Sequence, residues 1–206
     1  MFGVLKDILL PFFGVLSIFR TLDAHTTHLF NMPENLFVLL LCLVLMDFLY
    51  YLFHRLSHAT KFFWMFHFVH HSDKHYNLSV GFRSSFFEIL GLFLFYSPLL
   101  ILGIPLKIFL LAFSITSTYQ FLTHSRYIKL PKILSHILVS PRHHLIHHDE
   151  NIQHQNNNFA GVFSVWDRLF NTHTKEIVAF TPGIKGYEQD HFIKIHTDPI
   201  RRFLKI

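Results

Sequence analysis

Three long apolar runs dominate the pattern of hydrophobic and polar positions in the N-terminal part of the chain. Residues 36–53 contain one charged residue, Asp47, and residues 86–102 contain only Glu88, near their start. A third run covers residues 106–122. Apolar runs of about 18 residues are long enough to cross a bilayer as helices. A Gly-Ile-Pro turn separates the second run from the third, so these two predict a hairpin of membrane helices.

The two ends of the chain differ from this pattern. Residues 8–19 are apolar, but this stretch has only 12 residues and is interrupted by Pro11 and Gly14. It fits an interfacial or re-entrant helix better than a full span. Residues 1–35 are therefore expected to form an N-terminal interfacial segment, retained because no clear cleavage site follows it. Residues 123–206 have no long apolar run and are expected to form a cap outside the lipid.

These elements predict an all-α integral membrane protein, with three to four membrane helices and a helical cap in one domain over residues 1–206. The hairpin returns the chain to the side it left, so the cap and the ends of the spans share one membrane face. Lys107 marks the opposite hairpin tip, whereas eight basic residues flank the cap face: Arg55, Lys61, Lys74, Arg83, Arg126, Lys129, Lys132 and Arg142. The positive-inside rule then puts the cap in the cytoplasm. A soluble helical domain is disfavoured, because a protein this small can hardly cover three such runs.

Composition supports contact with lipid. The 206 residues are 51% hydrophobic and 15% charged, against about 25% charged in an average soluble domain. The net charge of +5 is scattered and no nucleic-acid motif is present, so we expect no nucleic-acid partner and read the charge as facing an anionic membrane surface. The only cysteine, Cys42, excludes an intramolecular disulfide and a cysteine-ligated zinc finger. Any metal site must use histidines and carboxylates.

Histidines are gathered in three short motifs, HRLSH, HFVHH and HLIHH. They hold eight of the 18 histidines: His54 and His58, then His67, His70 and His71, then His144, His147 and His148. Residues four apart lie about 40° apart on a helix, so each motif presents rings on one face. Eight imidazoles are enough for two metals with open positions left, and each adjacent pair can point one ring at each metal. Imidazole suits zinc, copper, iron and nickel, and a two-metal site suits oxygen activation or hydrolysis.

The other histidines are weaker candidates. His124 stands alone just after the hairpin. Five have no partner at ligand spacing and are read as ordinary: His25, His28, His173, His191 and His196. Three more, His75, His136 and His154, are intermediate. Eight neutral rings at a membrane face without a ligand would be costly to desolvate, which favours metal binding.

These motifs resemble the fatty acid hydroxylase / sterol desaturase superfamily of integral-membrane di-iron enzymes. Longer segments around and between the motifs also resemble this superfamily: DFLYYLFHRLSH, WMFHFVHHS, YNLSVGFRSS, QFLTH, SPRHHLIHH and WDRLF. They are most similar to the alkylglycerol monooxygenase-like and bacterial sterol-desaturase-like branch. The resemblance covers about residues 47–172.

The resemblance implies a membrane enzyme whose histidines hold two iron ions beside a lipid pocket; zinc can replace iron in purified protein. Dioxygen would then hydroxylate or desaturate a C–H bond of a fatty-acyl, sterol or ether lipid. By residue matching the ligands are His54, His58, His67, His70, His71, His124, His144, His147 and His148. Asp47, Asn77 and Arg83 match positions near the metals, and Asp47 is expected to accept a bond from a ligand imidazole. The implied location is the bacterial inner membrane, with the site facing the cytoplasm.

Several alternatives stay open. No dinucleotide or haem-attachment motif is present, so electrons must come from a partner protein or a diffusible reductant, of pterin, cytochrome or ferredoxin type. Ala59 and Phe68 depart from the branch pattern and weaken any claim to a pterin cofactor or an ether-lipid substrate. Hydroxylation and desaturation are not distinguished. The rival reading is a non-redox metalloprotein, either a zinc-dependent lipid hydrolase or a metal carrier, although a carrier should place more ionisable residues within its spans.

Overall fold

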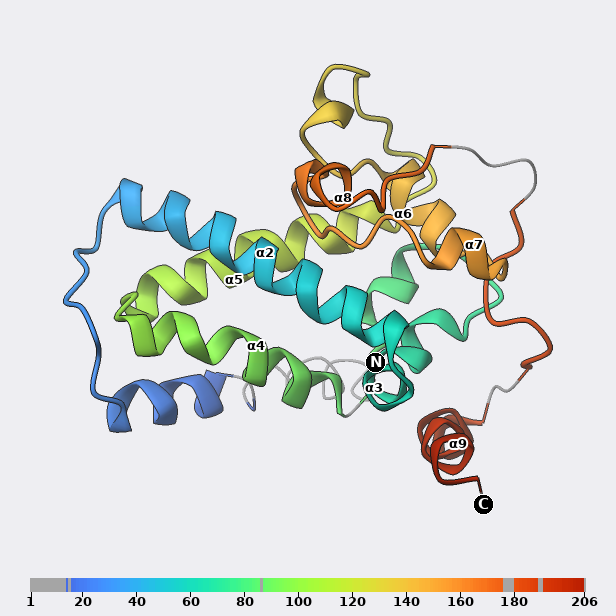
Figure 1. The fold of residues 1–206 in the computed structure, drawn as a ribbon, viewed down its shortest axis with the longest axis horizontal. Coiled ribbons are helices and arrows are strands. Elements are labelled where there is room, and N and C mark those ends of the chain that lie inside the picture. The colour runs from blue at the N-terminus through green and yellow to red at the C-terminus, as the bar shows by residue number, and fades with distance from the viewer. Residues whose placement is uncertain (1–13, 15, 86, 176–179, 189–190, 206) are drawn as a thin grey trace, which may run out of the picture.

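The described part of the chain is helical. The computed structural model describes residues 14, 16–85, 87–175, 180–188 and 191–205, and the regular elements there are helices with two isolated β-bridges (Figure 1). The predicted all-α fold class is confirmed. The apolar stretch at residues 8–19 falls mostly outside the described residues, but residues 16–25 are helical.

Helix α2 runs from Leu36 to Ala59 and carries the first histidine motif on its last turns. Asn35 caps its start by accepting a hydrogen bond from the Val38 N–H. Thr60 ends α2 and at once caps α3, Lys61–His71, where its hydroxyl accepts from the Phe63 N–H. This one-residue connection folds α3 back against α2, so the first two histidine motifs face each other.

The predicted hairpin is formed by α4, Glu88–Leu102, and α5, Leu106–Thr123. Gly103 makes the turn with a φ of 98°, and a Cβ at this position would collide with the backbone of Phe30. The segment before α2 docks on this tip, because the Leu29 and Phe30 N–H groups donate to the carbonyls of Ile101 and Leu102. Helices α2, α4 and α5 lie side by side as one bundle (Figure 1).

The bundle is apolar along its length, which indicates integration into a membrane. Helices α2 and α5 are long and apolar enough to cross one, whereas α4 has 15 residues. At 1.5 Å per residue α4 spans about 22 Å, less than the roughly 30 Å of a bilayer core. A core of ten buried residues fills the end of the bundle away from the histidines, and Phe19 packs there against Phe109 with ring centroids 4.7 Å apart.

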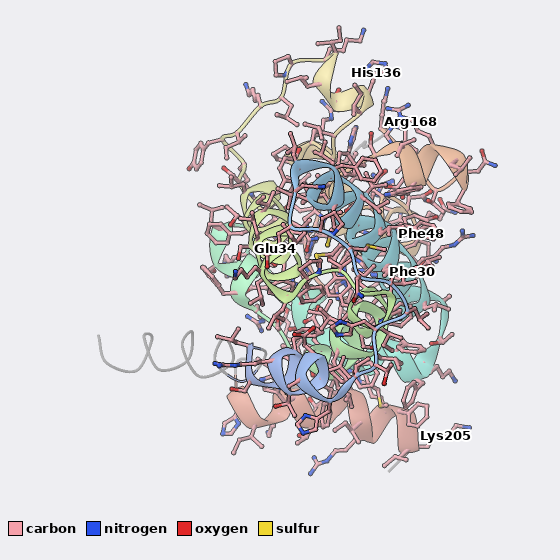
Figure 2. All side chains as sticks on the ribbon, turned by 90° about the vertical axis from the view of Figure 1, so that its left-hand side faces the viewer. Phe30, Glu34, Phe48, His136, Arg168 and Lys205 are labelled. Carbon is pink, nitrogen blue, oxygen red and sulfur yellow. The ribbon has the colours of Figure 1, made fainter. Side chains whose placement is uncertain are left out.

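The remaining elements are short and surround the other end of the bundle. They are η1 (Leu78–Phe82), η2 (Leu134–His136), α6 (Pro141–His147), α7 (Ile152–Gln155), α8 (Val165–Leu169) and α9 (Phe192–Leu204). Helix α6 carries the last histidine motif and begins with a capping box made by Ser140 and His143. Seen along the bundle, the η2 loop with His136 lies at one edge and Lys205, after α9, at the other (Figure 2).

Candidate metal centre

The structure brings all nine predicted histidines together as two neighbouring groups. The first histidine group is His54, His58, His67, His71 and His147, and the second is His70, His124, His144 and His148. Within each group one ring nitrogen per residue lies within 4.8 Å of the others. Helices α2, α3 and α6 supply the first group, whereas α3, the end of α5 and α6 supply the second.

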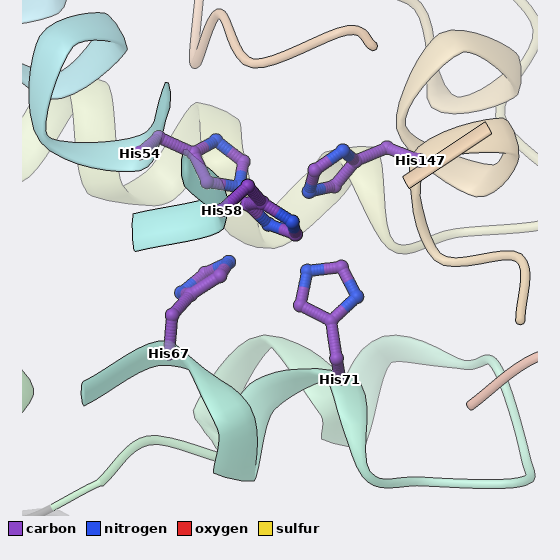
Figure 3. A group of neighbouring side chains, drawn as sticks. All are labelled: His54, His58, His67, His71 and His147. Carbon is purple, nitrogen blue, oxygen red and sulfur yellow. The ribbon is translucent and has the colours of Figure 1, made fainter. Parts of the chain in front are cut away.

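The first group points its rings at a common centre (Figure 3). The ring centroids of His54 lie 4.5 Å from His67 and 4.4 Å from His147, and those of His58 and His71 are 4.7 Å apart. Six nitrogens here are buried without a hydrogen-bond partner among the described residues. They are the Nε2 atoms of His54, His58, His67 and His147, and both ring nitrogens of His71.

The second group is tighter. The Nε2 atom of His124 lies 3.2 Å from that of His70 and 2.9 Å from that of His144, and the His144 and His148 Nε2 atoms are 3.2 Å apart. A tetrahedron with metal–nitrogen bonds of about 2.0–2.1 Å has edges of about 3.3 Å. The four lone pairs therefore converge at nearly the spacing of a coordination shell.

The two groups touch each other. The His71 ring of the first group stacks on the His148 ring of the second, with centroids 4.4 Å apart and planes at 17°. The adjacent pairs His70–His71 and His147–His148 are each divided between the groups. Two metals bound here would be near neighbours that share the walls of one site.

Backbone carbonyls orient the rings from outside. The Nδ1 atom of His54 lies 2.7 Å from the Phe159 carbonyl and that of His147 lies 2.8 Å from the Asn157 carbonyl. In the second group, Nδ1 of His124 lies 2.9 Å from the Gln120 carbonyl. A carbonyl can only accept, so each Nδ1 carries the proton and each Nε2 presents a lone pair inward, as metal-binding histidines commonly do.

Burial favours the neutral form of several of these rings. It lowers the pKa of His147 to about 3 and that of His124 to about 4. Burial also lowers the pKa values of His71 and His144 well below the usual range, with smaller contributions from neighbouring histidines. Neutral imidazole is the form that binds metal, so no proton has to be displaced at neutral pH.

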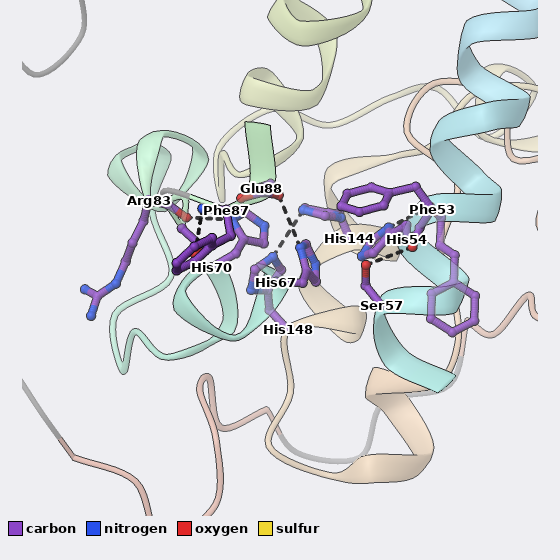
Figure 4. A network of polar contacts seen from close by, with 12 residues as sticks. Phe53, His54, Ser57, His67, His70, Arg83, Phe87, Glu88, His144 and His148 are labelled. Atoms are coloured by element: carbon purple, nitrogen blue, oxygen red, sulfur yellow. Dashed lines mark hydrogen bonds and ion pairs between the residues drawn. The ribbon is translucent and has the colours of Figure 1, made fainter. Parts of the chain in front are cut away.

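A carboxylate that the histidine motifs did not identify also reaches the centre. Glu88, at the start of α4, has Oε1 3.3 Å from Nδ1 of His67 (Figure 4), while its buried Oε2 has no hydrogen-bond partner among the described residues. The signal in the sequence was a single acid at the head of an apolar run. A carboxylate behind a ligand imidazole fixes its tautomer and raises its basicity.

The side chains of Asp47, Asn77 and Arg83, which were expected near the metals, make no hydrogen bond to the nine histidines of the centre. Asp47 does not accept from an imidazole: its oxygens bind Val162 N, Phe163 N and Trp166 Nε1 at 2.7, 2.8 and 3.0 Å. It lies seven residues before His54, about 10 Å lower along the helix. Asn77 is exposed and caps η1 by accepting from Ser79. Arg83 approaches the site through its carbonyl, 3.3 Å from His70 Nδ1, while its side chain binds Asp73.

Two cavities adjoin the groups from different sides. A narrow cavity of about 140 Å³ lies among α2, α4 and α5 and reaches His70, His124 and His144 of the second group. The apolar side chains of Leu92 and Phe113 form part of its wall. A polar cavity of about 1040 Å³ reaches His58 of the first group and is bounded by α7 and the α2–α3 corner.

Comparison with known proteins identifies the family. Residues 39–172, which include all nine histidines, match the fatty acid hydroxylase family. The chain belongs to the fatty acid hydroxylase family. Its resemblance to this family, which the histidine motifs indicated, is thereby confirmed. No solved structure is significantly similar to the chain.

Several relatives of this family member are enzymes named for lipid substrates. The alkylglycerol monooxygenase of Danio rerio is 39% identical over 127 residues, covering 62% of this chain and 28% of its own length. The human alkylglycerol monooxygenase is 37% identical, covering 69% and 33%. The ornithine lipid hydroxylase OlsE of Rhizobium tropici is 33% identical, covering 66% and 41%. The chain thus spans less than half the length of each of these relatives.

The donor set of this family member fits a pair of metal ions. The orphaned nitrogens of the first group are buried where a lost hydrogen bond costs about 1–3 kcal/mol each, and a metal would satisfy them together. All nine donors are imidazoles, which are suitable ligands for both iron and zinc. The geometry therefore supports a metal site without selecting the metal.

Glu88→Leu is expected to weaken metal retention by about 10–100-fold, the usual effect of losing the partner of a metal-bound histidine. Glu88→Gln keeps an oxygen that can accept from His67 and should recover much of the loss. A chelator titration of purified protein measures both. Glu34→Leu, an exposed acid paired with Lys107 at the hairpin tip, is the control. Wild-type retention in the leucine variant would show that Glu88 does not position His67.

Proposed function

We propose that this protein is a membrane-bound di-iron oxygenase that uses dioxygen to hydroxylate, or to desaturate, a C–H bond of a lipid. The observation that carries the proposal is the convergence of nine imidazoles, eight of them buried and His58 half-buried, beside a cavity lined by the apolar helices. The names of the relatives, alkylglycerol monooxygenase and ornithine lipid hydroxylase, support a lipid substrate for this chain.

In this proposal the nine histidines are the ligands of two irons, with five donors in one group and four in the other. Iron held there would supply the activation of dioxygen that an unreactive C–H bond requires. Insertion of one oxygen atom, with the other leaving as water, consumes two electrons and two protons. The chain carries no electron-carrying cofactor motif, so a partner protein or a diffusible reductant delivers the electrons.

The helices would hold the substrate. Leu92 and Tyr96 of α4 and Phe113 of α5 line the narrow cavity, so an extended acyl or alkyl chain can lie between them with its end toward His144. These three side chains form an apolar part of the cavity wall, which would shield the reacting carbon from water, while the rest of the wall is largely polar. The polar cavity beside His58 lies on the other side of the histidines and suits the entry of protons and reductant.

The proposal includes an orientation. The cap, residues 123–206, lies on the cytoplasmic side of a bacterial inner membrane, because the basic residues that flank the spans are gathered there and Lys107 marks the other end. Residues 1–206 form a single domain in which residues 36–53, 86–102 and 106–122 are the spans and residues 1–35 lie at the interface.

The test is lipid profiling of cells that express the protein under isotopically labelled dioxygen, because such cells supply the electron donor. Wild-type protein should yield lipids that carry one labelled oxygen, or lipids that have lost two hydrogens, and cells expressing His70→Ala should yield neither. Metal analysis of the same protein should find iron. Unchanged lipids alongside a full load of zinc would instead support the non-redox hydrolase or carrier.

A further inference from the structure

A second large cavity, outside the histidine centre, gathers several positive charges in its walls. It encloses about 880 Å³ between the loop that follows α5 and helix α6. No carboxylate is found among the described residues that line it, whereas five basic residues do: Arg126, Lys129, Lys132, Arg142 and Lys175. We call these five residues and the space between them the basic pocket.

The cations of the basic pocket are exposed and have no acidic partner within the described part of the chain. The polar cavity beside His58 differs, because its Lys61 and Lys185 share their walls with Asp149 and Glu150. Unpaired like charges repel each other, so a concentration of five of them is stabilised by a bound anion.

The basic pocket is also partly apolar. Ile128, Leu145 and Phe180 contribute to its walls, and the Arg126 guanidinium lies 5.7 Å from the centre of the Phe180 ring. The loop on its rim exposes further apolar side chains: Tyr127 is 94% and Ile133 is 77% accessible. Alternation of Lys and Arg with exposed apolar residues suits the boundary between lipid headgroups and acyl chains.

The loop is held at the flank of the bundle. It folds back beside the C-terminal half of α5 instead of continuing beyond the helix end, and in the view along the bundle it protrudes sideways (Figures 1 and 2). Arg168 of α8 fixes it there, because its Nε donates to the His136 carbonyl at 3.2 Å. A membrane that surrounds the bundle would therefore meet this loop at its surface.

We propose that the basic pocket binds the phosphate of an anionic phospholipid and so fixes the cap on the membrane surface. Basic pockets beside membrane helices recognise such headgroups, and the volume lies within the usual range for a small-molecule site. A concave, partly apolar pocket next to exposed loop side chains favours an amphiphile over an acidic protein.

The test measures phospholipid retained by the full-length protein in detergent micelles that contain phosphatidylglycerol or phosphatidylcholine. The variant Lys129→Gln/Lys132→Gln removes two charges whose side chains make no hydrogen bond or ion pair within the described residues, so the fold should be unaffected. Affinity for phosphatidylglycerol should fall about 25-fold, about fivefold for each cation. Retention of phosphatidylcholine should not change. The matched control, Arg20→Gln/Lys107→Gln, removes the same charge on other elements and should retain wild-type affinity.

Competition with glycerol phosphate distinguishes the sources of the anion. If glycerol phosphate does not displace phosphatidylglycerol, the occupant is a membrane lipid. If glycerol phosphate displaces it at a concentration similar to that of the lipid, the pocket is a phosphate site whose occupant is soluble. Equal losses in the two double variants would overturn the proposal, because only general surface charge would then be acting. Unchanged lipid retention combined with slower reduction by an acidic ferredoxin would also overturn it and assign the pocket to a protein partner. The lipid-retention and displacement readouts do not depend on catalysis, so their failure leaves the proposed oxygenase function untouched.

Discussion

His147→Ala and His70→Ala proteins are each expected to bind about one metal ion fewer per chain than wild type and to lose lipid oxidation. His147 belongs to the first histidine group and His70 to the second, so each substitution removes a donor from a different metal. Both rings also lie next to the other group: the His70 ring centroid is 4.9 Å from that of His67, and the His147 centroid is 5.7 Å from that of His144. Metal content by inductively coupled plasma mass spectrometry and oxygen uptake with lipid measure the two effects.

His143→Ala is the matched control for these variants. His143 is buried and lies on α6, like His147, but it belongs to neither group: its Nδ1 accepts from the Ser140 N–H in the capping box. Its loss should cost about 1 kcal/mol of stability as a helix cap and leave both metals in place. A full metal load and normal activity in His147→Ala and His70→Ala would refute the ligand assignment.

The histidine centre could be predicted from the sequence because its pattern is local. Spacings of three and four residues fix which rings share a helix face, and they gave the two HxxHH motifs without any knowledge of the fold. Adjacent histidines on a helix point about 100° apart, which is why His70–His71 and His147–His148 could be expected to divide between two metals. The hairpin then explained how distant motifs meet on one side of the bundle.

The supports of the centre could not be predicted in this way. Phe159 and Asn157 act through backbone carbonyls, which any residue carries, and they lie in a loop without periodicity. Glu88 could be noticed as an isolated acid, but its pairing with His67 depends on how α4 packs against α3. Asp47 was expected near the ligands because of its motif, yet its partners come from a segment more than 100 residues later.

Asp47 instead joins the cap to the bundle. It is fully buried in α2 and accepts three hydrogen bonds from the cap, from Val162, Phe163 and Trp166. The chain comes close to α2 here because residue 161 is glycine: a Cβ on it would lie 3.0 Å from Asp47 Oδ1.

Asp167 holds the same segment from within the cap, where burial raises its pKa to about 6 although hydrogen bonds oppose the shift. It accepts from the N–H groups of Phe159 and Ala160 at 2.8 and 3.0 Å. The carbonyl of Phe159 in turn orients His54. The two carboxylates therefore act on one stretch of backbone, which supports His54 of the first histidine group.

Asp47→Ala is expected to destabilise the protein by about 3–5 kcal/mol, because it leaves one buried and two partly buried donors without an acceptor. Asp47→Asn should be nearly as damaging, since an amide nitrogen would then face donors. Thermal unfolding and limited proteolysis of the cap measure the effect, and metal loss should accompany it because Phe159 no longer holds His54 in place. Asp73→Ala, which breaks a partly exposed ion pair with Arg83, should cost no more than about 1 kcal/mol. An Asp47→Ala protein as stable as the Asp73 variant would mean that the cap docks through its other contacts with α2, such as the Trp166 ring packed 4.9 Å from Phe48.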